Sequence, residues 1–229
     1  MNNFEQNVKQ LLINLNIYDE KVNLQTFYAA LTHTTYSNEH KSVKDFQYLE
    51  FLGDSIIQFF VTTEIYKNFP NYKEGIATKH RSYVVNNKTL STIANKLHIP
   101  NYVRASKNAF INGKNDKVNS DFFEAFTGAI YIEKGLDFVS KFLKDNLNSY
   151  IHNVTHDDLI DAKSEFQEVI QMHGISKIIY KSEPINEKEF SSSVIVDGQT
   201  FGTGIGKNKR SAEQEAAKNA LKNLISNKN

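Results

Sequence analysis

Two pairs of carboxylates lie on stretches that the sequence predicts as helices. Glu50 and Asp54 are four residues apart, and Asp121 and Glu124 are three apart. Such spacings put both members of a pair on one helix face. A divalent cation, a basic partner or solvent must stabilise these charges. If the two helices pack side by side, the four side chains form a site for one or two Mg²⁺, which would activate water and neutralise a phosphodiester.

Either pair alone is also compatible with an ordinary solvated helix face, which is where most charged residues on helices lie. Two features favour the metal site. Both pairs lie in runs so rich in apolar residues that little of either helix can face water, and no lysines alternate with the four carboxylates. Hard divalent cations prefer such oxygen ligands.

Composition excludes several classes of site. The chain has 229 residues, no cysteine, and 27 Lys and Arg against 26 Asp and Glu. Disulfides, thiolate catalysis and cysteine-ligated metals are therefore excluded, and any affinity for nucleic acid must come from local patches. The N-terminus lacks a basic segment followed by an apolar run, and no stretch approaches the ~18 apolar residues of a membrane span. We expect a soluble, unprocessed cytoplasmic protein with no membrane partner.

The first two thirds of the chain have helical periodicity. Apolar spacing predicts helices over residues 4–16, 24–32, 78–97, 120–133 and 136–147, and one from about residue 45 that ends before Pro70. The polar residues 34–44 are predicted to form a loop. His80, between two cations, is expected to be exposed. The segment 1–152 is thus predicted to be an all-α domain.

The pattern changes after a polar stretch, 153–160, which we interpret as a linker. A helix over 162–172 is followed by three short segments rich in β-branched or aromatic residues, 175–182, 189–196 and 199–204, and by a helix over 210–224. Asp197-Gly198 between the last two segments is a strong hairpin signal. The order α-β-β-β-α over 161–226 predicts a small α+β domain.

A glycine-rich segment in this second domain resembles a phosphate-binding loop but departs from it at two positions. Phe201 stands where such a loop needs its first glycine, and Asn208 where it needs Ser or Thr. We therefore expect no nucleotide cofactor.

Three motifs in order resemble the ribonuclease III family. They are Tyr48-Leu49-Glu50-Phe51-Leu52-Gly53-Asp54-Ser55, the stretch 78–90, and Ser120-Asp121-Phe122-Phe123-Glu124-Ala125-Phe126-Thr127-Gly128-Ala129-Ile130-Tyr131. The resemblance implies that Glu50, Asp54, Asp121 and Glu124 coordinate Mg²⁺, for which Mn²⁺ can substitute, and that Asp54 and Glu124 are the catalytic residues. It also implies a homodimer that cuts both strands of double-stranded RNA and leaves 5′-phosphates, 3′-hydroxyls and short 3′ overhangs.

Other positions near the first motif are also compared with the family. Phe51 would be the exposed aromatic residue that inserts into the partner subunit, although plain core is an equally good reading of it. Glu74 matches the family's acidic residue in the following turn. Gln47 and Tyr48, in contrast, stand where bacterial members usually have a glutamate and an arginine.

Residues 161–224 resemble a double-stranded RNA-binding domain. Lys207, Lys209 and Arg210 match its basic helix start, where cations and the helix dipole both favour phosphate. Gln167 and Glu168 match the residues that reach the minor groove. In the loop between the first two strands Glu183-Pro184-Ile185-Asn186 departs from the usual Gly-Pro-x-His. Asn186 can still contact RNA, but we expect this loop to hold RNA more weakly.

These observations favour a Mg²⁺-dependent endoribonuclease for structured ribosomal and messenger RNA precursors. The alternative is a catalytically inactive dimer that binds double-stranded RNA as an assembly protein. An inactive descendant would have no physical need to keep four mutually repelling carboxylates, which counts against the alternative.

Overall fold

The structure is a computed structural model that describes residues 2–111, 113–155, 159, 161–172, 174 and 177–226. The chain divides into two compact units, residues 1–155 and 156–229. This division falls within the predicted linker, 153–160, part of which lies outside the described residues.

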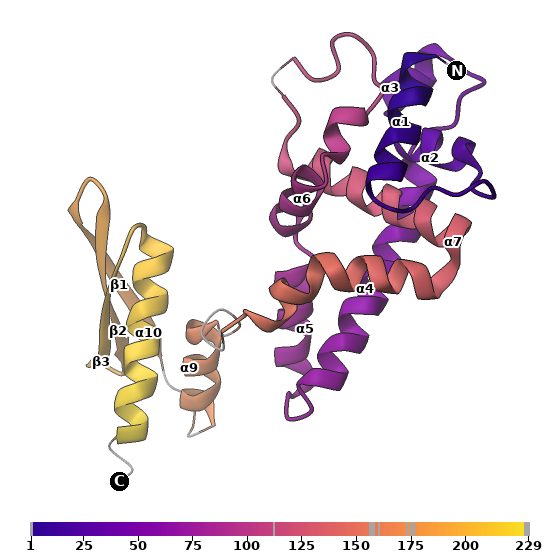
Figure 1. The fold of residues 1–229 in the computed structure, drawn as a ribbon. Coiled ribbons are helices and arrows are strands. Elements are labelled where there is room, and N and C mark those ends of the chain that lie inside the picture. Colours follow the sequence, from indigo (N-terminus) through magenta and orange to yellow (C-terminus); the bar gives the residue numbers. More distant parts are fainter. Residues whose placement is uncertain are drawn as a thin grey trace. The chain divides into compact units, whose positions relative to one another are not determined.

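The N-terminal unit is helical, as predicted. Its helices are α1 (Asn3–Asn14), α2 (Leu24–Ala30), α3 (Thr34–Glu39), α4 (Gln47–Asn68), α5 (Glu74–Val84), α6 (Asn87–Lys96), the short 3₁₀ helix η1 (Ile99–Tyr102) and α7 (Asp116–His152) (Figure 1). Helix α7 changes direction at Gly135, which has φ of 78°. None of the described helices combines the length and the apolar character that a membrane span requires.

Aromatic side chains of α7 fill the core of this unit. Phe122, Phe123 and Phe126 are fully buried, and the ring of Phe126 meets that of Phe27 from α2 at 5.5 Å. Burying rings of this size provides much of the hydrophobic stabilisation of a small domain. The core therefore fixes α7, including the turn that carries Asp121 and Glu124.

Helices α4 and α7 cross at two glycines. A Cβ atom built on Gly53 would lie 1.8 Å from the carbonyl oxygen of Glu124, and one on Gly128 would lie 2.3 Å from that of Leu49. Only residues without a Cβ permit two helix backbones to approach this closely. The crossing brings the turn that contains Glu50 and Asp54 against the turn that contains Glu124.

Three expectations for this unit are wrong in detail. Residues 34–39 of the predicted loop form α3, whose first turn is capped by the ring of His33, which accepts a hydrogen bond from the amide of Thr35 at 3.3 Å. The predicted helix 78–97 is two helices, because Asn86 starts α6 by accepting a hydrogen bond from the amide of Thr89 at 2.9 Å. His80 is buried, with Nε2 2.9 Å from the carbonyl oxygen of Ile151.

The C-terminal unit has the predicted order. Helix α9 (Ala162–Gln171) is followed by β1 (Ile178–Asn186), β2 (Glu189–Val196), β3 (Gln199–Gly206) and α10 (Lys209–Ser226), and the strands form an antiparallel sheet in the order β1-β2-β3. Asp197 and Gly198 both have positive φ, 49° and 88°, as a two-residue hairpin turn requires. The small core joins Phe166 of α9, Val194 of β2 and alanines of α10. The fold class predicted for both units is confirmed.

Candidate metal centre and RNA interface

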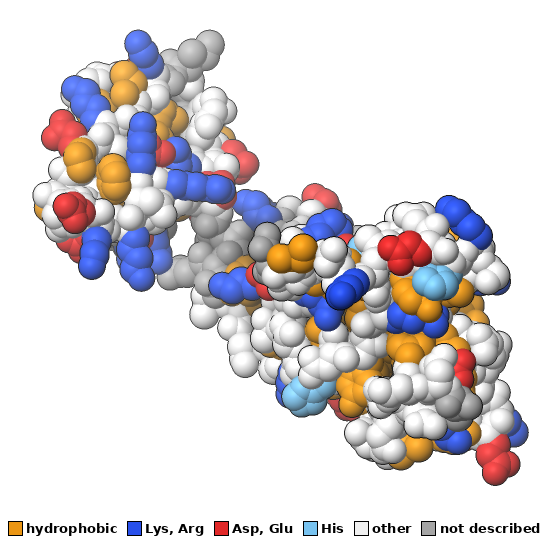
Figure 2. All heavy atoms as spheres, turned by 90° about the horizontal axis from the view of Figure 1, so that it is seen from above, with side chains coloured by type: hydrophobic (Ala, Val, Ile, Leu, Met, Phe, Trp, Pro, Cys, Tyr) orange, Lys and Arg blue, Asp and Glu red, His pale blue; other side chains and the backbone are white. Residues whose placement is uncertain are grey.

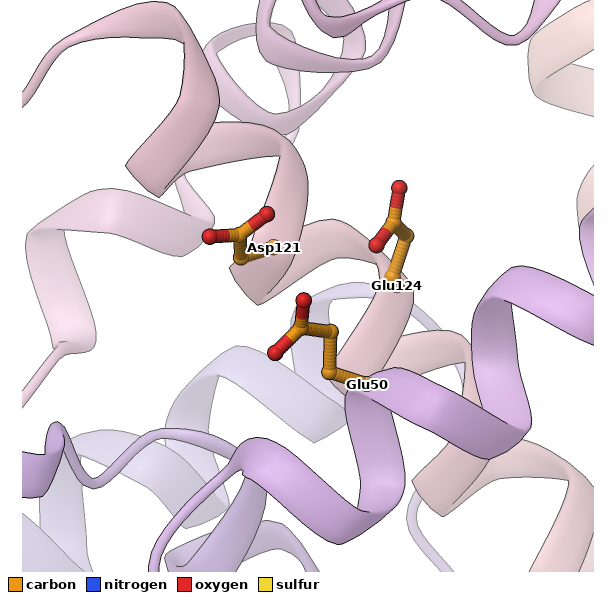
Figure 3. A group of neighbouring side chains, drawn as sticks. All are labelled: Glu50, Asp121 and Glu124. Carbon is orange, nitrogen blue, oxygen red and sulfur yellow. The ribbon is translucent and has the colours of Figure 1, made fainter.

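Three of the four predicted metal ligands come together at the crossing of α4 and α7. One carboxylate oxygen from each of Glu50, Asp121 and Glu124 lies within 4.8 Å of the others. Figure 3 shows Glu50 rising from α4 toward Asp121 and Glu124 on α7. Glu124 is buried, with 9% of its surface exposed, and the other two are half-buried. We call these three side chains the carboxylate cluster.

Burial and mutual repulsion shift the pKa values of two carboxylates in the cluster. Burial, followed by the charges of Asp54, Asp121 and Glu50, raises the pKa of Glu124 to about 8. Burial and the charge of Asp121 also raise the pKa of Glu50. Like charges held together out of water favour the protonated form, and a bound cation reverses that preference. Three oxygen donors at this spacing have the chemistry that hard divalent cations select.

The fourth predicted ligand, Asp54, is not one of the three side chains of the carboxylate cluster. Its two carboxylate oxygens accept hydrogen bonds from Nε2 of Gln58, at 3.0 and 2.9 Å. Among the charged neighbours of Glu124, Asp54 nevertheless makes the largest contribution to its raised pKa. Asp54 therefore acts electrostatically on the buried end of the cluster without being one of the three grouped side chains.

Sequence reasoning missed four residues that shape this site. Gly53 and Gly128 set the approach of the helices, and Gln58 holds Asp54. Lys117 lies one turn before Asp121 on α7 and forms an ion pair with it, Nζ to Oδ1 at 2.7 Å. That hydrogen bond raises the pKa of the Lys117 ammonium. Two sequence features could have indicated these residues: the glycines lie inside otherwise apolar helices, and the lysine lies four residues before a predicted ligand.

The remaining positions of this unit lie outside the carboxylate cluster. Phe51 is 69% exposed, so the core reading of this residue is wrong, and its insertion into a partner subunit stays a prediction. Tyr48 is 83% exposed, and its ring stacks on that of Phe51 at 6.2 Å. Gln47 is exposed at the first turn of α4. Glu74 starts α5 and accepts a hydrogen bond from the hydroxyl of Thr78 at 3.0 Å.

The exposed aromatic residues of α4 follow a single stripe. Tyr48, Phe51, Phe59 and Tyr66 are 61–83% exposed, and the exposed positions Ser55 and Thr62 continue the same helical spacing. This stripe contains no charged residue. A large uncharged aromatic surface of this kind on a helix is typical of a protein interface. We call these six residues the aromatic stripe.

In the C-terminal unit, the predicted basic residues surround the start of α10. Lys207, Lys209 and Arg210 are all exposed. Asn208 starts the helix, because its side-chain oxygen accepts a hydrogen bond from the amide of Ser211 at 2.9 Å, and the Ser211 hydroxyl accepts one from the amide of Asn208 at 3.1 Å. Figure 2 shows Lys and Arg side chains gathered on the visible face of this unit. A helix N-terminus flanked by three cations has the charge that favours phosphate.

The other predicted RNA contacts lie on α9 and on the first hairpin. Gln167 and Glu168 are exposed on α9, and Gln167 shares a hollow of about 340 Å³ with Arg210 of α10. Asn186 is exposed but already engaged in the turn: its amide nitrogen donates to Glu189, and its oxygen accepts from the amide of Lys188, both at 2.9 Å. The structure thus links Gln167 with the basic end of α10, whereas Asn186 stabilises its own hairpin.

Comparisons with known proteins agree for both units. The family model described as ribonuclease-III-like matches residues 23–151, and the model of the double-stranded RNA binding motif matches residues 162–224. The chain is 36% identical over 216 residues to "Ribonuclease 3" of Streptococcus thermophilus, covering 91% of this chain and 93% of that protein. It is 34% identical over 213 residues to "Ribonuclease 3" of Clostridium tetani, covering 90% and 91% of the two chains.

Solved structures give the same result for the helical unit. The crystal structure of the nuclease domain of ribonuclease III from Campylobacter jejuni is 28% identical, with a TM-score of 0.55, and covers 68% of this chain and 100% of that one. A second structure of that domain, with a TM-score of 0.54, 28% identity and coverage of 62% and 99%, is described as showing flexibility in the region involved in dimer formation.

Proposed function

This chain belongs to the ribonuclease III family and is an endoribonuclease that acts on double-stranded RNA, and from that premise we propose that it works as a Mg²⁺-dependent homodimer. The observation that carries the proposal is the convergence of Glu50, Asp121 and Glu124 at the crossing of α4 and α7. Relatives named as ribonucleases over most of the chain favour an enzyme over the catalytically inactive binding protein.

The residues proposed to hold the cation are Glu50, Asp121 and Glu124, with Asp54 beside them. Their fit to a divalent ion rests on hard oxygen donors, and on the burial and neighbouring negative charges that raise the pKa of Glu124 to about 8. When bound, Mg²⁺, or Mn²⁺ in its place, supplies activation of water and neutralisation of charge on the phosphodiester. The chain's own part is to present these carboxylates, of which Asp54 and Glu124 are the proposed catalytic residues.

The start of α10 and the exposed face of α9 are proposed to hold the RNA. Lys207, Lys209 and Arg210 are suited to phosphates, and Gln167 and Glu168 to the minor groove with its 2′-hydroxyls. The Asn186 hairpin is proposed to contribute less, because its amide is bonded to Glu189. We propose structured ribosomal and messenger RNA precursors as substrates.

The aromatic stripe of α4 is proposed as the subunit contact. Its exposed rings, with Phe51 among them, would bury apolar surface in a symmetric dimer. Two carboxylate clusters in one dimer would each cut one strand of a duplex. The proposed products carry 5′-phosphates, 3′-hydroxyls and short 3′ overhangs.

The direct test is cleavage of a long RNA duplex in Mg²⁺ and in EDTA. We expect Mg²⁺-dependent cutting of the duplex but not of the same strand alone. Glu124→Gln should lower the cleavage rate by at least about 100-fold, since it removes a proposed catalytic carboxylate, and should leave duplex binding in a gel-shift assay unchanged. Asp137→Asn is the control, because Asp137 is exposed on α7, beyond Gly135.

Two results would contradict the proposal. The first is a wild-type protein that binds the duplex without cutting it in Mg²⁺, which would return the binding-protein alternative. The second is equal loss of cleavage in Glu124→Gln and Asp137→Asn, which would mean that the carboxylate cluster has no special role.

A further inference from the structure

Gln58 holds the carboxylate of Asp54. The two residues lie one turn apart on α4, and a single amide nitrogen, Nε2 of Gln58, donates to both carboxylate oxygens at 3.0 and 2.9 Å. Both side chains are half-buried. An ionised carboxylate can only accept hydrogen bonds. The atom of the Gln58 amide that faces Asp54 is therefore the nitrogen, which donates, and not the oxygen.

Asp54 is placed where its orientation matters. It directly follows Gly53, whose backbone lies against the Glu124 carbonyl at the crossing of α4 and α7. The carboxylate is nevertheless outside the carboxylate cluster, whose three ligand oxygens lie within 4.8 Å of one another. The two hydrogen bonds from Gln58 hold the Asp54 carboxylate on α4, one residue after the glycine of this crossing.

The chemistry of the donor suits a positioning role. An amide restricts the rotation of a carboxylate without adding charge, so the attraction of the site for a cation is kept. Lys117 on Asp121 differs in this respect, because its ammonium adds positive charge to the same site. Removing a group that hydrogen-bonds to a metal-ligating carboxylate and so orients it commonly lowers metal affinity or activity by about 10- to 100-fold.

We infer that Gln58 is a positioning residue for the reaction: its amide fixes Asp54 in the orientation in which this carboxylate assists the binding of the divalent cation at the carboxylate cluster. The inference rests on the proposed function, since it assigns Gln58 a role at the proposed metal site. Gln58 itself is given no contact with RNA or with the cation.

The test measures the binding of Mn²⁺ to the full chain in the absence of RNA. The concentration of free Mn²⁺ is monitored by its electron paramagnetic resonance signal. Gln58→Met keeps the length of the side chain and suits a helix but removes the donor. We expect about 10-fold weaker Mn²⁺ binding in this variant and a similar fall in kcat, with unchanged KM and unchanged duplex affinity in EDTA. Gln58→Leu is the second donor-free variant and should behave in the same way.

The control is Gln10→Met on α1. It removes the same kind of hydrogen bond, in which Nε2 of Gln10 donates to Oδ1 of Asn14, four residues further along the helix, at 2.9 Å. Here the acceptor is an amide and not a carboxylate. This control should bind Mn²⁺ as the wild type does. Thermal unfolding in EDTA checks that all three variants are folded.

The outcomes separate this inference from the proposed function. If the wild type binds Mn²⁺, Glu124→Gln abolishes that binding and Gln58→Met leaves it unchanged, the positioning role is wrong and the metal site stands. If the wild type shows no Mn²⁺ binding that depends on Glu124, the metal site itself is wrong. Weaker binding in both Gln58 variants, with Gln10→Met normal, supports the inference.

Discussion

At the scale of single residues, Glu124 shows how burial and like charge act together. Burial and three neighbouring carboxylates disfavour the anion and raise the pKa of its carboxyl group to about 8. The same side chain is therefore neutral in the metal-free protein at neutral pH. It becomes a strong anionic ligand only when a cation offsets the charges around it.

This raised pKa predicts how stability depends on pH without metal. Between the ordinary value of 4.5 and about 8, the folded protein binds more protons at Glu124 than the unfolded chain does. The stabilisation by the protonated form is complete below the unfolded pKa and is lost as pH rises through the folded pKa. In EDTA we expect the free energy of unfolding of the wild type to fall by roughly 2–4 kcal/mol relative to that of Glu124→Gln as the pH rises from about 5 to 8. Urea unfolding measures this difference. Parallel pH profiles for the two proteins would contradict this.

The ion pair of Lys117 leads to an independent prediction for the same site. Its ammonium is paired with Asp121, and most of the Lys117 side chain faces solvent, so the ion pair is weak. The ammonium therefore competes only weakly with a divalent cation for the Asp121 carboxylate. Lys117→Met should strengthen Mn²⁺ binding several-fold, the reverse of the effect expected for Gln58→Met, because it removes a positive charge from the carboxylate cluster. Binding weaker than that of the wild type would show that Lys117 supports the ligands instead of competing with the ion.

At the scale of elements, the crossing of α4 and α7 determines the site. Gly53→Ala would place a Cβ 1.8 Å from the Glu124 carbonyl oxygen, and backbone cannot move aside as a side chain can. We expect a loss of stability of about 3 kcal/mol or more, together with loss of metal binding, as the two helices are pushed apart. Gly75→Ala is the matched control, because a Cβ there meets no atom within 4 Å. Similar thermal unfolding of the two variants would contradict this account of the crossing.

The carboxylate pairs could be predicted from the sequence because helical spacing alone puts Glu50 with Asp54 and Asp121 with Glu124. Their meeting depends on tertiary contacts at Gly53 and Gly128, which periodicity does not reveal. That Asp54 is not among the three grouped side chains likewise depends on tertiary geometry that periodicity does not reveal. Helix α3 was missed because His33 caps it and it has no apolar periodicity, whereas the hairpin at Asp197-Gly198 was predictable because its positive φ values require such residues.

At the scale of the whole molecule, the aromatic stripe predicts association. Phe51→Asp would place a charge within the proposed apolar contact, where it could not be solvated. We expect sedimentation to show a dimer for the wild type at micromolar concentration and a monomer for this variant. Met172→Asp is the control, since Met172 is 82% exposed but lies in the C-terminal unit. A Phe51→Asp dimer as tight as that of the wild type would exclude the stripe as the subunit contact.

In the proposed mechanism, the carboxylate cluster binds the cation that cleavage requires. The most direct measurement is a crystal structure of the full chain with an RNA duplex and Mn²⁺, in which anomalous scattering locates the ion. We predict an Mn²⁺ peak bound to Glu50, Asp121 and Glu124, beside a phosphodiester of the duplex. An ion bound elsewhere, with these three carboxylates free of metal and away from the RNA backbone, would contradict the account.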